Sequence, residues 1–187
     1  MGFWGIPISI DDRPTDPVDT DRSTVETIHK MIALVRSACL SPEVCRVVNT
    51  CLASLPKNHS LSDLARAIYY WIQEHVRFCE DEKLLAQRLG LPIDKELLID
   101  PRVLLSMPQP MGDCDDFSML AASCLVCANV PCKFVAIAAD KGLPWKFSHV
   151  YVKCFVDGQW MGFDASHGNC LGWEYKDATR LAEWGIN

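Results

Sequence analysis

Three residues of this chain have the types that thiol chemistry on a carbonyl group requires. Cys114 can act as a nucleophile, His149 as the base that holds its proton, and Asp164 as the group that orients the base. Cys114 lies in the run GDCDDF (residues 112–117), directly after a proline-rich segment. His149 begins a run rich in β-branched and aromatic residues, and Asp164 ends the next such run.

Residues 114–128 predict the central helix of the fold. From position 119 onward almost every residue is apolar or small, so this helix is expected to be buried on all sides. Asp113 is expected to cap it, because two prolines just upstream forbid an earlier start. The positive end of the helix dipole then favours a thiolate at Cys114. Asp115 and Asp116 oppose that charge, so a partner cation is needed, and a histidine imidazolium would supply it.

The second half of the chain predicts an antiparallel sheet. Its strands are expected at residues 132–139, 148–156 and 159–163. Asp157-Gly158 is a signal for a tight hairpin between the last two strands. The register that such a turn imposes places His149 near Asp164, at one end of the sheet. Because helices come first and strands later, the predicted class is α+β.

Other elements are predicted around this centre. We expect an extended arm over residues 1–10 that docks on the body and a polar surface linker over 11–22. Helices are expected from an N-cap at Ser23, with Glu26 completing a capping box, through Val35, then from Ser41-Pro42 to about residue 53, and from Ser60 to about residue 76. A short amphipathic helix is predicted at 80–89, and a C-terminal helix covering the sheet at 173–184.

The bulk composition predicts one soluble domain. The 187 residues are 49% hydrophobic, which suffices for a sizeable core. We divide them into an arm and linker (1–22), a helical cap (23–60) and a core (61–187). With a net charge of −6 and no run of Lys or Arg, nucleic acid and anionic membranes are disfavoured as partners. No apolar run has the length of a transmembrane helix and no secretory signal is recognised, so a cytoplasmic location is expected.

The ten cysteines allow a second class of function, metal or thiol redox chemistry. Cys124 and Cys127 have a ligand spacing and would act with Cys132, Cys154 or Cys170. The pair lies late in an apolar helix, however, whereas zinc knuckles place it on a turn. Buried inert thiols are therefore favoured, and we expect no metal and no cofactor. Three further residues are interpreted in the same way, as core cysteines at positions 39, 45 and 51, and His75 is interpreted as a structural histidine.

Several of these motifs together resemble the transglutaminase-like superfamily, in particular its compact bacterial and phage members. The resemblance rests on GDCDDF opening a helix, NVPCKF (129–134) following that helix, a strand opening with histidine, and DGQW (157–160) leading to Phe-Asp. The segment from Tyr70 to Phe78 also resembles the helix that precedes the family core. The similarity covers roughly residues 61–166. It implies a papain-like fold and carries the triad over to Cys114, His149 and Asp164.

The resemblance implies an acyl transfer at amide or peptide bonds of a peptide or protein substrate. Cys114 would attack the carbonyl group, and a thioester would form as His149 protonates the leaving amine. The oxyanion would be held by the Cys114 backbone N–H and a second group, for which Gln109, Trp145 and Asp113 are candidates as oxyanion or substrate contacts. Hydrolysis is favoured. The alternatives are glutamine cross-linking and a silent peptide-binding module on the same fold, and the oligomeric state is not predicted.

Overall fold

The computed structural model describes residues 8–12, 17–80 and 95–186, and its helices and strands confirm the predicted α+β class. The helices are α1 (Pro17–Ala38), α2 (Pro42–Ala53), α3 (Leu61–His75), α5 (Pro101–Ser106) and α6 (Cys114–Cys127). The strands are β1 (Ile8–Asp12), β2 (Arg77–Phe78), β3 (Lys95–Ile99), β4 (Met111–Gly112), β5 (Cys132–Ile137), β6 (His149–Val156), β7 (Gln159–Phe163) and β8 (Leu181–Gly185).

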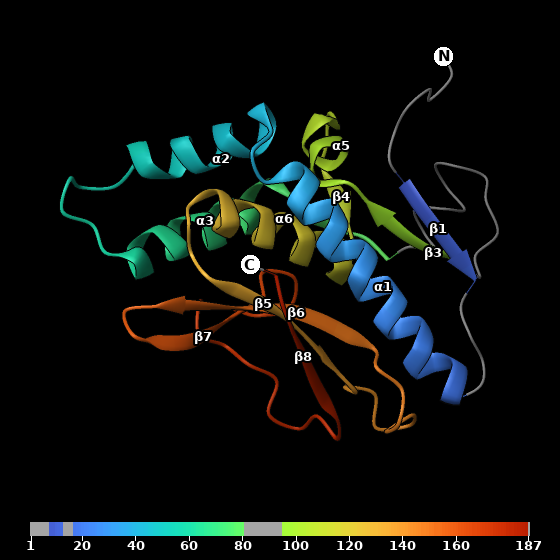
Figure 1. Cartoon of the computed structure of the whole chain (residues 1–187). Helices are drawn as coiled ribbons and strands as arrows, with labels where there is room; N and C mark the ends of the chain where they lie inside the picture. The colour runs from blue at the N-terminus through green and yellow to red at the C-terminus, as the bar shows by residue number, and fades with distance from the viewer. Residues whose placement is uncertain (1–7, 13–16, 81–94, 187) are drawn as a thin grey trace, which may run out of the picture.

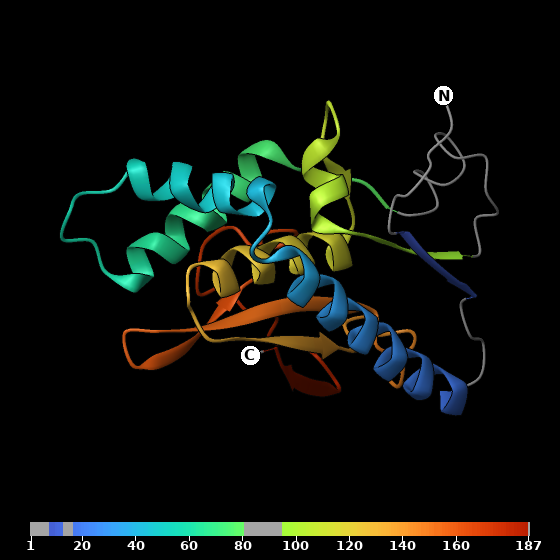
Figure 2. The ribbon, with the colours of Figure 1, turned by 45° about the horizontal axis from the view of Figure 1, so that its top comes forward.

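The main sheet has four antiparallel strands in the order β7-β6-β5-β8. The helices gather on one side of it, and α6 is the helix next to the sheet (Figure 1; Figure 2). Alternate residues of β5 and β6 face these helices and join the main core; they are Cys132, Phe134, Val150, Val152, Cys154 and Val156. A sheet with one covered face alternates in this way. Two short ribbons, β1 with β3 and β2 with β4, complete the pairing of the described strands.

The predicted hairpin between β6 and β7 is confirmed. Asp157 and Gly158 both have positive φ, 50° and 84°, as a two-residue turn of the type that matches strand twist requires. Glycine adopts this conformation without a steric penalty. The pairing runs from Val156 with Gln159 back to Val152 with Phe163. The first residue of β6 and the residue after β7 therefore lie at the same end of the sheet.

Helix α6 is the buried centre that its composition predicted. Every residue from Asp115 to Leu125 is buried, and the helix contacts α1, α2, α3 and α5 on one side and β6 on the other. A helix that is apolar all round is stable only when other elements surround it. The start of α6 is thereby held against both the helical layer and the sheet.

The predicted polar linker over residues 11–22 and the helix start at Ser23 are wrong. Asp11 and Asp12 belong to β1, and α1 already begins at Pro17, while residues 13–16 lie outside the described part. Proline fits the first turn of a helix. The early turns are then held by an ion pair between Asp21 and Arg180, with two N–O distances of 3.0 Å. The arm prediction holds for residues 8–10, which pair with β3.

The predicted C-terminal helix is also wrong. Residues 181–185 form β8, which pairs with β5 from Ile137–Leu181 to Lys133–Gly185. The edge of β5 would otherwise have unpaired backbone groups, and β8 satisfies them. Ile186, the residue after β8, is bonded to Arg36 of α1. Nε and Nη2 of Arg36 donate to the carbonyl oxygen of Ile186 at 3.1 and 3.0 Å.

Helices α2 and α3 follow the prediction, whereas α5 was not predicted. Ser41 caps α2, and Ser60 caps α3 in a capping box with Asp63. His75 is exposed and its ring stacks on that of Trp71. Its Nδ1 lies 2.8 Å from the carbonyl oxygen of Trp71, which agrees with a structural histidine. Most of the helix predicted at 80–89 lies outside the described residues. Within the described ranges, no helix combines the length and apolarity needed to cross a membrane.

Candidate active site

Cys114 is the first residue of α6 and is partly buried. Its thiol lies 3.6 Å from Oδ1 of Asp115, to which it can donate. Asp113 caps the turn, since its Oδ1 accepts a hydrogen bond from the Asp115 N–H at 3.1 Å. The capped first turn predicted around Cys114 is thus confirmed. The N–H groups of such a turn point away from the helix and favour negative charge beside it.

Gly112 precedes this cap because no side chain fits at its position. A Cβ there would overlap the carboxylate of Asp116, which is fully buried. That carboxylate accepts hydrogen bonds from the backbone N–H groups of Ile99 at 2.8 Å and Asp113 at 3.4 Å. A buried carboxylate needs such partners. Asp116 therefore ties the start of α6 to the end of β3.

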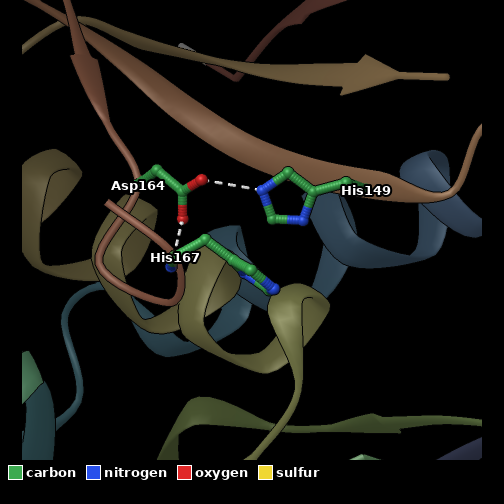
Figure 3. Close-up of side chains that lie close together, drawn as sticks. All are labelled: His149, Asp164 and His167. Atoms are coloured by element: carbon green, nitrogen blue, oxygen red, sulfur yellow. Dashed lines mark hydrogen bonds and ion pairs between the residues drawn. The ribbon is translucent and has the colours of Figure 1, made fainter. Parts of the chain in front are cut away.

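His149 and Asp164 meet at the end of the β6–β7 hairpin, as the register predicted. Nε2 of His149 lies 2.7 Å from Oδ2 of Asp164, and the side chains are 8% and 1% exposed. Figure 3 shows the two groups facing each other. A carboxylate only accepts, so Nε2 carries a proton and donates it. The other ring nitrogen, Nδ1, is then left as the base.

A turn after Asp164 holds its second oxygen. Oδ1 accepts hydrogen bonds from the Ser166 hydroxyl at 2.8 Å, the Ser166 N–H at 3.2 Å and the His167 N–H at 3.0 Å. Burial alone raises the pKa of Asp164, but the hydrogen bond and charge of His149, together with the Ser166 and His167 donors, bring that pKa below its ordinary value. Asp164 is therefore an anion at neutral pH.

His167 lies beside this pair and was missed by the sequence reasoning. Its ring packs edge to face against His149, with centroids 4.6 Å apart, and against Phe78 at 5.0 Å (Figure 3). Burial first, and then the charge of His149, lower the pKa of His167, although Asp164 acts in the other direction. A signal was present, because an Asp often accepts hydrogen bonds from the residues two and three positions later. That rule would have brought Ser166 and His167 to the site.

Cys114 and His149 line the same cleft, which has a volume of about 850 Å³. Its walls come from the first half of α1, the start of α6, the loop between β5 and β6, and the segment after β7. Pockets of this size accept a peptide segment or a drug-sized ligand. Asp113 and His167 also line the cleft. The structure thus brings the predicted nucleophile and the predicted base to one cavity.

The helix and the strand that carry these two residues are bonded to each other. The hydroxyl of Ser118 donates to the carbonyl oxygen of Val150 at 3.1 Å, and both residues are buried. Ser118 lies one helical turn after Cys114, and Val150 directly follows His149. Their contact therefore limits how far α6 can slide along β6.

The profile of the transglutaminase-like superfamily matches residues 50–165. This is more than half of the chain, and it includes Cys114, His149 and Asp164. The chain belongs to the transglutaminase-like superfamily. The resemblance noted in its sequence is confirmed, and helix α3, the family core and the β6–β7 hairpin all lie within the matched range.

Three solved structures are similar to this transglutaminase-like chain. A candidate protease from Parabacteroides distasonis shares 15% identity over 73% of this chain and 26% of its own, with a TM-score of 0.48. A candidate cysteine protease from Cytophaga hutchinsonii shares 14% identity over 96% of this chain and 63% of its own, with a TM-score of 0.46. A TGase shares 16% sequence identity over 85% of this chain and 40% of its own, with a TM-score of 0.45. The chain therefore spans less than two thirds of each of these proteins. A search of curated proteins gave no match.

Two of the predicted oxyanion candidates of this transglutaminase-like chain do not line the cleft. Gln109 is exposed between α5 and β4, and Trp145 is 46% exposed; neither is among the residues that line the cleft. The carbonyl oxygen of Trp145 accepts a hydrogen bond from Arg180. Asp113 does line the cleft, but as the helix cap. The geometry thus gives no support to Gln109 or Trp145 as the second donor.

The alternative of a metal site at Cys124 and Cys127 has no support in the described residues. Cys124 is fully buried, which raises its pKa well above the ordinary value, and burial with Cys45 raises that of Cys127 to about 11. Neither thiol belongs to a described group of three or more potential ligands. Two groups in the described part have potential ligand atoms within 4.8 Å of one another: His149, Asp164 and His167, and Asp113, Cys114 and Asp115. All of these residues except Asp164 line the cleft.

Proposed function

We propose that this protein is a cysteine-dependent enzyme that transfers acyl groups from amide or peptide bonds through a thioester, with water as the favoured acceptor. One observation carries the proposal. Asp164 holds His149 by Nε2 at 2.7 Å, which leaves Nδ1 as the base in a cleft that Cys114 also lines. Membership of the transglutaminase-like superfamily supports the same assignment.

Acylation begins with transfer of the Cys114 thiol proton to Nδ1 of His149. The anionic Asp164 stabilises the imidazolium that results. The thiolate attacks the carbonyl carbon of the substrate, and a C–S bond forms. As the C–N bond breaks, the proton on Nδ1 passes to the leaving nitrogen, and a free amine departs. The backbone N–H of Cys114, at the start of α6, is the proposed first oxyanion donor.

Deacylation uses the same residues in reverse. A water molecule gives a proton to Nδ1 of His149 while its oxygen attacks the thioester carbon. The C–S bond then breaks, a carboxylic acid leaves, and the proton on Nδ1 again balances the thiolate of Cys114. Asp164 remains an anion throughout, because its four hydrogen bonds favour that state.

Transfer to a primary amine is the second candidate, and the charge of the cleft favours it. Its described lining includes the carboxyl groups of Glu80, Asp113, Asp115 and Asp140, against the single ammonium group of Lys146. Such a cleft attracts an ammonium group. If a primary amine added to the reaction diverts the acyl group from water, transfer is the activity.

The test is the rate at which iodoacetamide alkylates Cys114 as a function of pH, followed by peptide mass spectrometry. At pH 5.5 an unpaired thiol is only about 0.1% thiolate. We therefore expect Cys114 to react on the order of tenfold or more faster in the wild type than in His149→Ala, after allowing for the lower nucleophilicity of acidic thiols. His75→Ala serves as a matched control, since His75 is exposed and its ring bonds the carbonyl oxygen of Trp71 in its own helix. Uniformly slow cysteines would instead favour a peptide-binding module.

A further inference from the structure

The hydroxyl of Ser166 determines where His167 carries its proton. It donates its one proton to Oδ1 of Asp164 at 2.8 Å. Its oxygen can then only accept from its other partner, Nδ1 of His167, at 2.9 Å. Neutral His167 therefore has its proton on Nδ1, and its Nε2 carries no proton. Adding a second proton at Nε2 changes the charge of the ring without breaking these bonds.

Two histidines are thus arranged around one carboxylate. His149 donates to Oδ2 of Asp164 at 2.7 Å, and His167 reaches Oδ1 through Ser166 and through its own N–H. The two rings lie edge to face with centroids 4.6 Å apart (Figure 3). His149 is buried and His167 is exposed, and positive charges this close disfavour each other by on the order of one pKa unit.

We propose that His167 is a positioning residue of the reaction, which has to be neutral for His149 to hold the proton of Cys114. The inference rests on the proposed function, since it concerns the same ion pair. Neutral His167 adds no charge beside His149. Protonated His167 places a like charge there and favours the inactive state with a neutral imidazole and a thiol. His167 then limits activity on the acid side.

Several other titratable groups also lie around the two rings. Burial raises the pKa of Tyr151, which stacks on His149, so it stays neutral. Burial and the charge of His149 lower the pKa of His167, which keeps that ring neutral at pH 7. The other titratable groups that face the cleft from α6, β2, the β5–β6 loop and the segment after β7 are Cys114, Asp113, Asp115, Glu80, Asp140, Lys146 and Tyr175.

The experiment compares His167→Phe with His167→Lys in the full chain. Phenylalanine keeps an aromatic ring between His149 and Phe78 but cannot be charged, whereas lysine is charged throughout. Both are assayed by the rate of iodoacetamide alkylation at Cys114 between pH 3 and 8. Because the charge of lysine favours the neutral imidazole and thiol, we expect Cys114 in the Lys variant to react up to about tenfold more slowly than in the Phe variant between pH 5 and 7. The wild type should match the Phe variant at pH 7. His75→Phe is the control, because His75 is exposed and stacked on Trp71.

Equal alkylation rates for the two variants overturn the proposal, because packing without charge would then explain the contact. A second readout needs no substitution. In protein labelled with ¹⁵N-histidine, neutral His167 is expected as the Nδ1–H tautomer, and an Nε2–H tautomer overturns the inference. Failure of the proposed function has a different signature. In that case wild-type Cys114 reacts no faster than an unpaired thiol, and both proposals fail together. A fast wild-type Cys114 with equal rates in the two variants removes only the role of His167.

Discussion

Replacing Asp164 by Asn is expected to invert the tautomer of His149. Oδ1 of Asp164 accepts hydrogen bonds from the Ser166 hydroxyl, the Ser166 N–H and the His167 N–H, while Oδ2 accepts one from His149. An asparagine has one oxygen and one NH₂ group, so only one side keeps its acceptor. At about 1 kcal/mol for each hydrogen bond, the orientation with oxygen toward Ser166 and His167 is favoured by about 2 kcal/mol, or roughly thirtyfold.

In that orientation the NH₂ group faces Nε2 of His149, which then has to accept. The proton of the imidazole moves to Nδ1, and no base remains for the thiol of Cys114. Loss of the correct tautomer in a triad lowers the rate of acylation by roughly 10²–10⁴-fold. The effect differs from simple loss of a charge, because the side chain keeps its shape and most of its hydrogen bonds.

The assay is alkylation of Cys114 by iodoacetamide at pH 5.5, together with the ¹⁵N shifts of labelled histidine. Asp164→Asn should react at the rate of an unpaired thiol, and His149 should appear as the Nδ1–H tautomer. Asp157→Asn is the matched control, because Asp157 is an exposed turn residue at φ 50°, a conformation that Asn tolerates well. The reasoning is refuted if Asp164→Asn retains the wild-type rate with the proton on Nε2.

Three further outcomes are expected. Gly112→Ala should lower the free energy of unfolding by about 1–3 kcal/mol in urea denaturation, because its Cβ displaces the carboxylate of Asp116. Since folding lowers the pKa of Asp164 from 3.8, its contribution to stability is complete above about pH 4 and is lost as the pH falls through the folded value; the difference in denaturation midpoint between the wild type and Asp164→Asn should therefore shrink below that pH. Cys132, whose pKa burial raises to about 12, should be alkylated at least about tenfold more slowly than Cys114 at pH 7 in peptide mass spectrometry.

The β6–β7 hairpin could be predicted because its information is local. Asp157-Gly158 favours positive φ at both positions, and a two-residue turn then determines every pair along the two strands. The meeting of His149 with Asp164 follows from that register, although they are 15 residues apart. The start of α6 could also be predicted, because Asp113 caps the helix by hydrogen bonds with residues two and three positions later.

The two ends of the chain could not be predicted because distant contacts decide them. The pattern around Ser23 fits a helix start, but α1 extends back to Pro17, and its early turns are bonded to Arg180, 159 residues from Asp21. Residues 181–185 have no strong strand pattern of their own. They become β8 because the edge of β5 is available for pairing. Local propensity is overridden in both places by tertiary structure.

The same distinction divides the candidate site into two halves. The pairing of His149 with Asp164 lies within one hairpin, so it depends on a turn and should survive changes elsewhere in the core. The approach of Cys114 to His149 joins a helix to a strand, and it depends on contacts such as the hydrogen bond from Ser118 to Val150. Because protein cores are close-packed, a shift of α6 along β6 is transmitted directly to the sulfur. The packing of α6 against the sheet, and not the hairpin, is therefore the part of the fold on which the reactivity of Cys114 most depends.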